Sequence, residues 1–369
     1  MNPPLTHAPH AHAPTSVGQV MAMVMLALVP ATLFGFWLYG WPAIFLWTLA
    51  IATALLAEAA ALRLQDRPVR PALLDGSALL TAWLLAVSLP PFAPWWIAAI
   101  GSAFAIIIGK QVFGGLGQNV FNPAMAARVM LLISFPVEMT IWTAPTPIST
   151  GQAPGFLQSL AITFGGASGA TQWDGLASAS LLGHVKTEFT RGVDLLASLP
   201  GHFAAVHGGL ADAAWGSRAG SLGETAGLLL LLGGVFLIAR RIITWHAPAA
   251  MLLGVAAPAL VAHALAPAHY LGVLPHLLSG GLMLAAFFIV TDPVTSPNTQ
   301  AGQFIFGLSC GLLTWIIRTW GGYPEGVAFA VMIMNALTPI IDRYVKPRIY
   351  GRTRKGQSLP LETRPEVVR

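Results

Sequence analysis

Charge and cysteine are both scarce in this sequence. Only 9% of its 369 residues are charged, whereas soluble globular proteins carry about 25%. This is too little charge to cover a water-exposed surface, which excludes an ordinary soluble enzyme. A hydrophobic share of 55% also excludes intrinsic disorder. The single cysteine, Cys310, excludes a disulfide framework, a CxxC redox pair and a cysteine-ligated zinc or iron–sulfur site within this chain.

A basic patch with interleaved aromatic residues is lacking too. The formal net charge is +5, but the Lys and Arg residues lie between apolar segments and in the C-terminal tail. This distribution is typical of membrane orientation signals and argues against nucleic-acid binding.

Long apolar segments dominate what is present. A helix needs about 20 apolar residues to cross the hydrocarbon core of a bilayer, and ten segments approach this length. Several are short and bounded by Pro or Gly, which is tolerated at membrane depth where protein covers the chain. The sequence therefore predicts an all-α polytopic membrane protein. Its predicted spans are residues 20–40, 42–62, 77–89, 95–109, 123–136, 222–239, 247–264, 275–291, 303–319 and 324–341.

The basic residues predict the orientation of these spans. Fourteen of the nineteen Lys and Arg residues fall on one side if the ten spans are threaded in order. Because cytoplasmic loops are enriched in Lys and Arg, we expect both termini in the cytoplasm. The longest connection, residues 137–221, then faces the outside of the membrane.

An internal repeat is indicated by two Gly-Gly elements. Gly114-Gly115 recurs as Gly321-Gly322 at an offset of 207, and each pair follows an apolar helix that ends in Lys110 or Arg318. Each copy would hold five helices, so the second copy enters the membrane in the opposite sense, and such inverted repeats place sites near the midplane. We therefore predict a flexible cytoplasmic tail at 1–19, five-helix repeats at 20–136 and 222–341, an extracytoplasmic loop at 137–221 and a basic cytoplasmic tail at 342–369.

A few polar side chains fall inside or next to the predicted spans. Asn119 and Asn122 are three residues apart, so they share one face if this stretch is helical. Asp292 would cost about 2.5–3.5 kcal/mol to insert without a partner. Such groups bind a ligand, pass an ion or cap a broken helix. Capping and ligand binding are equally good interpretations of Asn122, and Asp292 favours a function, whereas Glu58 and Arg128 would extend to the membrane interface.

Two strings of small residues stand out in the 137–221 loop. One is Ser168-Gly-Ala-Thr171 and the other runs from Asp174 to Ser180 (DGLASAS). Neither resembles the Gly-x-Ser-x-Gly turn of hydrolases. Taken alone, each string is typical of a flexible linker.

Longer motifs indicate a family. The runs FGGLGQNVFNPAM (113–125), LLISFP (131–136), TDPVTSP (291–297) and WIIRTWGGYPEGVAFA (315–330) are long and specific. With them, the chain resembles the RnfD family, the D subunits of Rnf ion-translocating electron-transport complexes, from the first span to Tyr350. The related NqrB subunits of sodium-translocating NADH:quinone reductases share part of this pattern, but the GLGQ and LISFP spellings are closer to the RnfD family.

The resemblance implies a covalently bound FMN in the large loop. Family members carry FMN joined through its phosphate to a hydroxyl side chain by a flavin transferase, in a motif similar to Asp-x-x-Ser/Thr-Gly-Ala-Thr/Ser. Asp174 to Ser180 matches the aspartate, the alanine and the final hydroxyl, but departs at Ala177 and Ser178. The string ending at Thr171 lacks the aspartate, because Gly165 stands there. We therefore expect Ser180 as the acceptor, with Thr171 as the alternative.

A second, non-covalent flavin, riboflavin, is also implied by the resemblance. Asn119, Asn122 and Asp292 match its pocket, and two amides with a carboxylate provide the donors and acceptors that an isoalloxazine edge needs.

The implied function is electron transfer in a bacterial inner-membrane complex, with residues 137–221 periplasmic. Ferredoxin and NAD would be handled by other Rnf subunits, because this chain has neither a dinucleotide fingerprint nor cluster cysteines, and electron flow would be coupled to Na⁺ or H⁺ movement. No residue is assigned a catalytic or metal-binding role. The expected partners are the other subunits, the flavin transferase and the lipid bilayer, and no nucleic acid. Two alternatives stay open at this point: a ten-helix transporter or channel without a redox role, and a structural membrane anchor.

Overall fold

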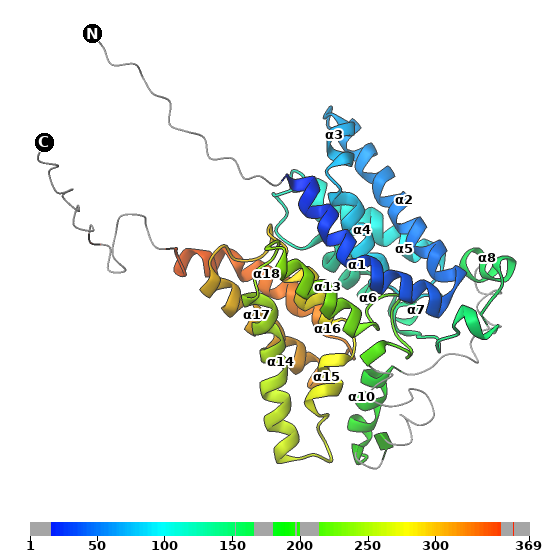
Figure 1. Cartoon of the computed structure of the whole chain (residues 1–369), viewed down its shortest axis with the longest axis vertical. Helices are drawn as coiled ribbons and strands as arrows, with labels where there is room; N and C mark the ends of the chain where they lie inside the picture. The colour runs from blue at the N-terminus through cyan, green and yellow to red at the C-terminus, as the bar shows by residue number, and fades with distance from the viewer. Residues whose placement is uncertain are drawn as a thin grey trace, which may run out of the picture.

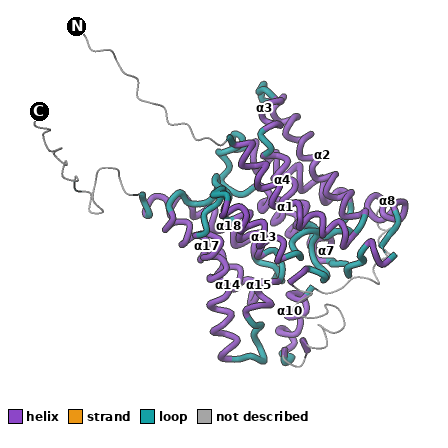
Figure 2. Tube along the Cα trace, viewed as in Figure 1, coloured by secondary structure: helices purple, strands orange, loops and turns teal. Residues whose placement is uncertain are grey.

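The computed structural model describes residues 16–151, 153–165, 180–195, 198–199, 214–347 and 357. In these residues the fold consists of helices and turns, with no strand (Figures 1 and 2). Two of the residues singled out in the large loop, Thr171 and Asp174, lie outside the described residues.

Among the residues that the structure describes, five helices are long and apolar enough to cross a membrane. They are α1 (Val17–Tyr39), α2 (Trp41–Leu64), α14 (His246–Leu265), α17 (Gln300–Trp320) and α18 (Val327–Tyr344). Four further apolar helices are shorter: α4 (Ser77–Ser88), α5 (Trp95–Ile106), which continues as the π-helix η1 (Ile107–Gln111), α6 (Pro123–Ser134) and α13 (Gly227–Ala239). The prediction of an all-helical polytopic membrane protein is confirmed, while the number of ten spans stays a prediction.

The predicted span at 275–291 is not one continuous helix. It consists of α15 (Val273–Leu278), α16 (Leu282–Leu284) and the π-helix η5 (Ala285–Ile289). The chain breaks between α15 and α16, where Gly280 has φ +64°, a conformation that glycine adopts without steric cost. All residues from Leu282 to Ile289 are buried. Because protein covers these residues on every side, this broken segment lies inside the fold and not at its surface.

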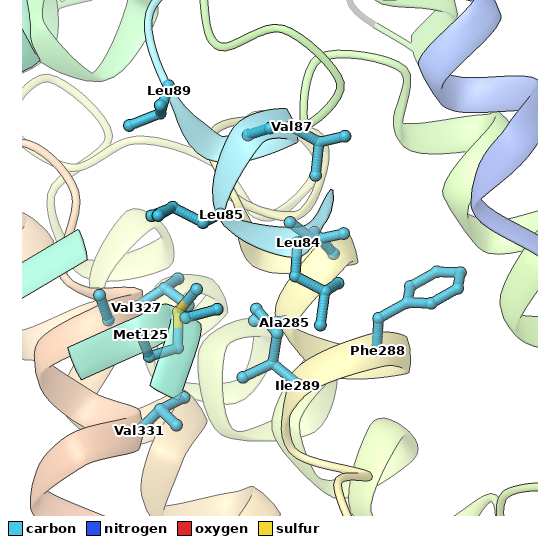
Figure 3. Packing of buried hydrophobic residues seen from close by; sticks show 14 of the residues in the cluster. Leu84, Leu85, Val87, Leu89, Met125, Ala285, Phe288, Ile289, Val327 and Val331 are labelled. Carbon is cyan, nitrogen blue, oxygen red and sulfur yellow. The ribbon is translucent and has the colours of Figure 1, made fainter. Parts of the chain in front are cut away.

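The main core lies where both halves of the chain meet. Residues of α4 and α6 from the first half pack against η5 and α18 from the second half (Figure 3). The labelled contacts include Leu84, Leu85, Val87, Met125, Ala285, Phe288, Ile289, Val327 and Val331. The two halves therefore form one body with a shared core.

The 137–221 connection carries short helices that pack on the membrane helices. These are α7 (Pro136–Thr140), the 3₁₀ turn η2 (Ile148–Thr150), α8 (Phe156–Phe164) and α10 (Leu181–Arg191). The Phe156 ring of α8 lies 5.2 Å from the ring of Trp41 in α2. Helix α3 (Val69–Leu74) lies at the end of the molecule opposite to α10 (Figure 1).

Glycines allow α14 and α17 to pack closely. A Cβ placed on Gly311 would collide with the backbone oxygen of Met251, and one on Gly307 would collide with that of Ala247. Small residues four positions apart let two helix backbones approach within a membrane. The α14–α17 contact therefore depends on the absence of side chains at these positions.

We expect Gly311→Leu to separate α14 from α17 and to lower the free energy of unfolding by about 1–3 kcal/mol, the usual cost of overpacking. Thermal unfolding of the purified chain in detergent measures this loss. Gly322→Leu is the matched control, because a Cβ at Gly322 meets nothing within 4 Å. Equal losses in both variants would contradict close packing at Gly311.

Candidate functional site

Two cavities contain those predicted site residues that the structure describes: Ser180 in one, and Asn119, Asn122 and Asp292 in the other. The first, named here the Ser180 cavity, has an empty volume of about 480 Å³, and the second, the Asp292 cavity, has one of about 1100 Å³. The polar residues that line the Ser180 cavity include Ser180, Arg128, Arg218, Glu224, Thr225 and Glu325.

Ser180 is the N-cap of α10. Its Oγ accepts a hydrogen bond from the backbone N–H of Gly183 at 3.2 Å, a role that serine fills well because the first N–H groups of a helix have no partner within it. Lys186, on the same helix, donates from Nζ to the carbonyl oxygen of Thr319 at 2.9 Å, and burial lowers the pKa of this amine. The hydroxyl predicted to accept FMN is thus held at one place on the cavity wall.

Two buried ion pairs lie at this cavity, which Arg128, Glu224 and Glu325 line. Arg128 on α6 pairs with Glu224, whose other carboxylate oxygen accepts from Ser221 Oγ at 2.8 Å. Arg318 on α17 pairs with Glu325 at 3.0 Å. The first pair joins α6 to the loop before α13, 96 residues away. The second is local and joins the end of α17 to the loop before α18, seven residues further along the chain.

Arg318 also provides hydrogen-bond donors for the backbone at the break between α15 and α16. Its guanidinium donates to the carbonyl oxygens of His276 at 2.8 Å and Ser279 at 2.9 Å. Glu325 accepts from the N–H of Gly281 at 2.9 Å. Backbone groups freed by a helix break are costly to bury without partners, so this one ion pair stabilises the break.

The Asp292 cavity brings together the three residues proposed for a second flavin. Asn119 and Asn122 come from the first half of the chain and Asp292 from the second. The wall around them is largely apolar and includes Leu84 of α4, Phe287 and Phe288. Sequence position alone, with 170 residues between Asn122 and Asp292, would not have placed these side chains in one cavity.

Asn122 caps a helix and lines the cavity at the same time. Its Oδ1 accepts from the N–H of Met125 at 3.2 Å, which caps α6, while its Nδ2 donates to Asp292 Oδ2 at 3.2 Å. Asp292 also accepts from the hydroxyl of Thr295 at 3.0 Å. The capping interpretation of Asn122 is confirmed, and a role in ligand binding stays a prediction.

A third buried ion pair borders the Asp292 cavity. Lys110 Nζ donates to Glu58 Oε1 at 2.8 Å and to Ser77 Oγ at 2.7 Å. Glu58 is 1% exposed and Arg128 is 6% exposed. The expectation that Glu58 and Arg128 extend to the membrane interface is therefore wrong, because each has a buried partner of opposite charge.

The two cavities offer different chemistry. The Ser180 cavity presents a hydroxyl beside guanidinium groups, a donor set that suits a phosphate ester. The Asp292 cavity presents amides and a carboxylate within an apolar wall, which suits a flat heterocycle with a polar edge.

Known proteins resemble this chain over almost its whole length. The NQR2, RnfD, RnfE family model matches residues 5–351. The D subunit of the ion-translocating oxidoreductase complex of Halorhodospira halophila is 51% identical over 355 residues, covering 96% of this chain and 97% of the relative. Its counterpart in Stutzerimonas stutzeri is 55% identical over 345 residues (94% and 95%), and that in Salmonella paratyphi A is 44% identical over 362 residues (95% and 99%). The resemblance drawn from the motifs is confirmed.

We expect Glu224→Gln to leave Arg128 buried without a counter-charge and to lower the free energy of unfolding by about 3–5 kcal/mol. Removing both charges in Arg128→Met/Glu224→Leu should recover most of this loss, because replacing a whole buried pair by apolar residues is close to neutral. Thermal unfolding in detergent measures both variants.

The control for this prediction is Glu188→Gln. The partner of Glu188, Arg191, has a side chain that is 68% exposed and lies 3.5 Å away, so this loss should stay below about 1 kcal/mol. A double variant as unstable as Glu224→Gln alone would contradict the importance of charge pairing at this position.

Proposed function

Because the chain belongs to the NQR2, RnfD, RnfE family, we propose that it is the membrane subunit of a flavin-dependent complex that couples electron flow between ferredoxin and NAD to the translocation of Na⁺ or H⁺. The observation that carries this proposal is the position of Ser180: its hydroxyl stands at the start of a helix on the wall of a cavity lined by buried arginines.

The first part of the proposal is covalent FMN on Ser180. The serine Oγ would attack the flavin-side phosphorus of a phosphoanhydride donor held by the flavin transferase, lose its proton and displace the second phosphate. Bound FMN would supply the redox chemistry, while the chain sets its position and solvent access. Gly183 leaves the hydroxyl accessible, because a Cβ there would stand 3.2 Å from Ser180 Oγ.

The second part is a non-covalent riboflavin in the Asp292 cavity. Its support is the joint presence of Asn119, Asn122 and Asp292 on one cavity wall. The amides donate and accept hydrogen bonds and the carboxylate accepts them, so together they match the mixed polar edge of an isoalloxazine.

The position of helix α6 supports the proposal that electrons pass between flavins in the two cavities. Asn122 at its start lines the Asp292 cavity and Arg128 lines the Ser180 cavity. At 1.5 Å rise per residue, these positions are about 9 Å apart along the helix. One short helix therefore borders both proposed flavin positions.

The inverted repeat is proposed on the correspondence of elements. Adding 207 to the bounds of α1, α2, α5–η1 and α6 places them over α13, α14, α17 and α18 respectively. Lys110 and Arg318 also make corresponding hydrogen bonds in the two halves. Lys110 donates to Ser77 at the start of α4, and Arg318 donates to the carbonyl oxygen of Ser279 before α16. This correspondence supports ten spans in two five-helix units.

The proposed location is the bacterial inner membrane, with both termini cytoplasmic and residues 137–221 periplasmic. The separation of α3 and α10 to opposite ends of the molecule supports this orientation (Figure 1). The relatives are named as subunits of a complex, so the partners proposed for this chain are the other membrane, iron–sulfur and flavin subunits.

We expect Ser180→Ala to abolish covalent flavin, because the alanine has no oxygen to form the phosphoester. Flavin fluorescence of the protein band on a denaturing gel, together with intact mass, measures this loss in chain produced with the flavin transferase. Thr187→Ala on the exposed side of α10 is the control and should keep its FMN. A fluorescent Ser180→Ala band that is lost in Thr171→Ala would move the acceptor to Thr171, and a colourless wild-type chain would favour a transporter or channel.

We expect Asn119→Leu to weaken the binding of non-covalent flavin roughly tenfold, the worth of about one hydrogen bond, and to leave covalent FMN unchanged. Flavin released by denaturation and quantified per chain measures the effect. Asn298→Ser is the control, because Asn298 is exposed and bonded to Asp342. Equal release from wild type and Asn119→Leu would contradict a flavin at this wall.

A further inference from the structure

Within the described residues, Arg218 is a buried cation with no carboxylate of its own: the charge of Glu325 acts on it, but Glu325 is paired with Arg318. It is 4% exposed, and its guanidinium donates to Ser279 Oγ at 3.1 Å and to the carbonyl oxygen of Leu278. The neighbouring Arg128 and Arg318 pair with glutamates, but Arg218 forms no ion pair within the described ranges. Burying a charge without an opposite charge is costly, so an anion is expected beside Arg218.

The glutamates at this cavity already have arginine partners. Glu224 pairs with Arg128 and Glu325 pairs with Arg318, so Arg218 is the one of these three buried arginines that has no ion pair. Burial lowers the pKa of Arg218 to about 10, so the side chain still carries its charge at neutral pH. Arg218 therefore brings to the cavity wall a charge that no ion pair within the described residues neutralises.

A second polar group in this cavity also lacks a partner. Thr225 is 3% exposed, and its Oγ1 has no hydrogen-bond partner in the part of the chain that the structure describes. Ser180 lines the same cavity from the N-terminus of α10. A guanidinium, a free hydroxyl and the positive end of a helix are all groups that bind phosphate.

We propose that Arg218, together with the hydroxyl of Thr225, binds the phosphate of the FMN ester on Ser180. This contact holds the flavin near the break between α15 and α16, whose residues Ser279 and Gly280 line the same cavity. This proposal rests on the proposed function. Arg218 is a positioning residue, because it holds the tether and not the reacting ring. The planar guanidinium suits the task, since it presents two parallel N–H donors to two phosphate oxygens.

The wild-type chain tests this without substitution. The full-length chain is purified in a phosphate-free neutral detergent in two forms, one produced without the flavin transferase and one with it. Inorganic phosphate is titrated against potassium chloride of equal ionic strength, and thermal unfolding is followed by tryptophan fluorescence. We expect phosphate to raise the Tm of the flavin-free form by about 2–4 °C and to leave the FMN-bearing form unchanged, because its site is filled.

Variants then assign the effect to Arg218. Arg218→Gln should lose the phosphate response of the flavin-free form, Arg218→Lys should keep part of it, and Arg191→Gln, an exposed arginine on α10, should keep all of it. In the FMN-bearing form, Arg218→Gln should make the flavin more accessible to iodide quenching. If Arg218→Gln does not fold, the comparison of the two wild-type forms still decides.

The contrary outcomes are distinct. A phosphate response that is absent, equal in both forms, or unchanged in Arg218→Gln would overturn the proposal. An equal response in both forms would mean that FMN does not occupy this site. Its natural ligand would then be another phosphate, such as a lipid headgroup. A chain whose intact mass lacks FMN after production with the transferase would overturn the flavin assignment together with this proposal, whereas FMN present without the phosphate difference would overturn the role of Arg218 alone.

Discussion

Breaking helices inside an apolar fold is the constraint on which the rest of this structure depends. A broken helix leaves N–H and C=O groups without partners, and neither lipid nor a hydrophobic core can satisfy them. Arg318 and Glu325 solve this problem at the break between α15 and α16 by binding the freed carbonyls and an N–H while neutralising each other. The break in turn lets Ser279 and Gly280 form part of the wall of the Ser180 cavity.

The first half of the chain uses the same solution at a different place. Lys110 leaves the membrane helix at a π-helical turn and binds Glu58 and Ser77, which holds the start of α4 beside the Asp292 cavity. Irregular helix geometry and buried charge therefore occur together, next to each cavity. Because these charged side chains are paired, they can stand in the walls of cavities inside an otherwise apolar protein.

The sequence located the polar residues better than it described their surroundings. Asn119, Asn122 and Asp292 were recognisable because polar side chains are rare in apolar segments, and their motifs matched a family. Glu58 and Arg128 were misinterpreted because their partners lie 52 and 96 residues away, and local pattern contains no information on such pairing. The sequence also did not predict that Arg218 and Ser180 line one cavity, since a loop rich in Gly, Ser and Ala has no periodicity that indicates its packing.

By itself, the sequence determined the helical class, the membrane-embedded character and the family of this protein, because apolar length, Pro and Gly positions and contiguous motifs are local properties of the chain. Only the tertiary structure decided which charges are paired, where a helix breaks and which half contributes each cavity wall. The physical reason is that the free energy of a buried charge depends on what surrounds it in three dimensions, and those neighbours come from distant parts of the chain.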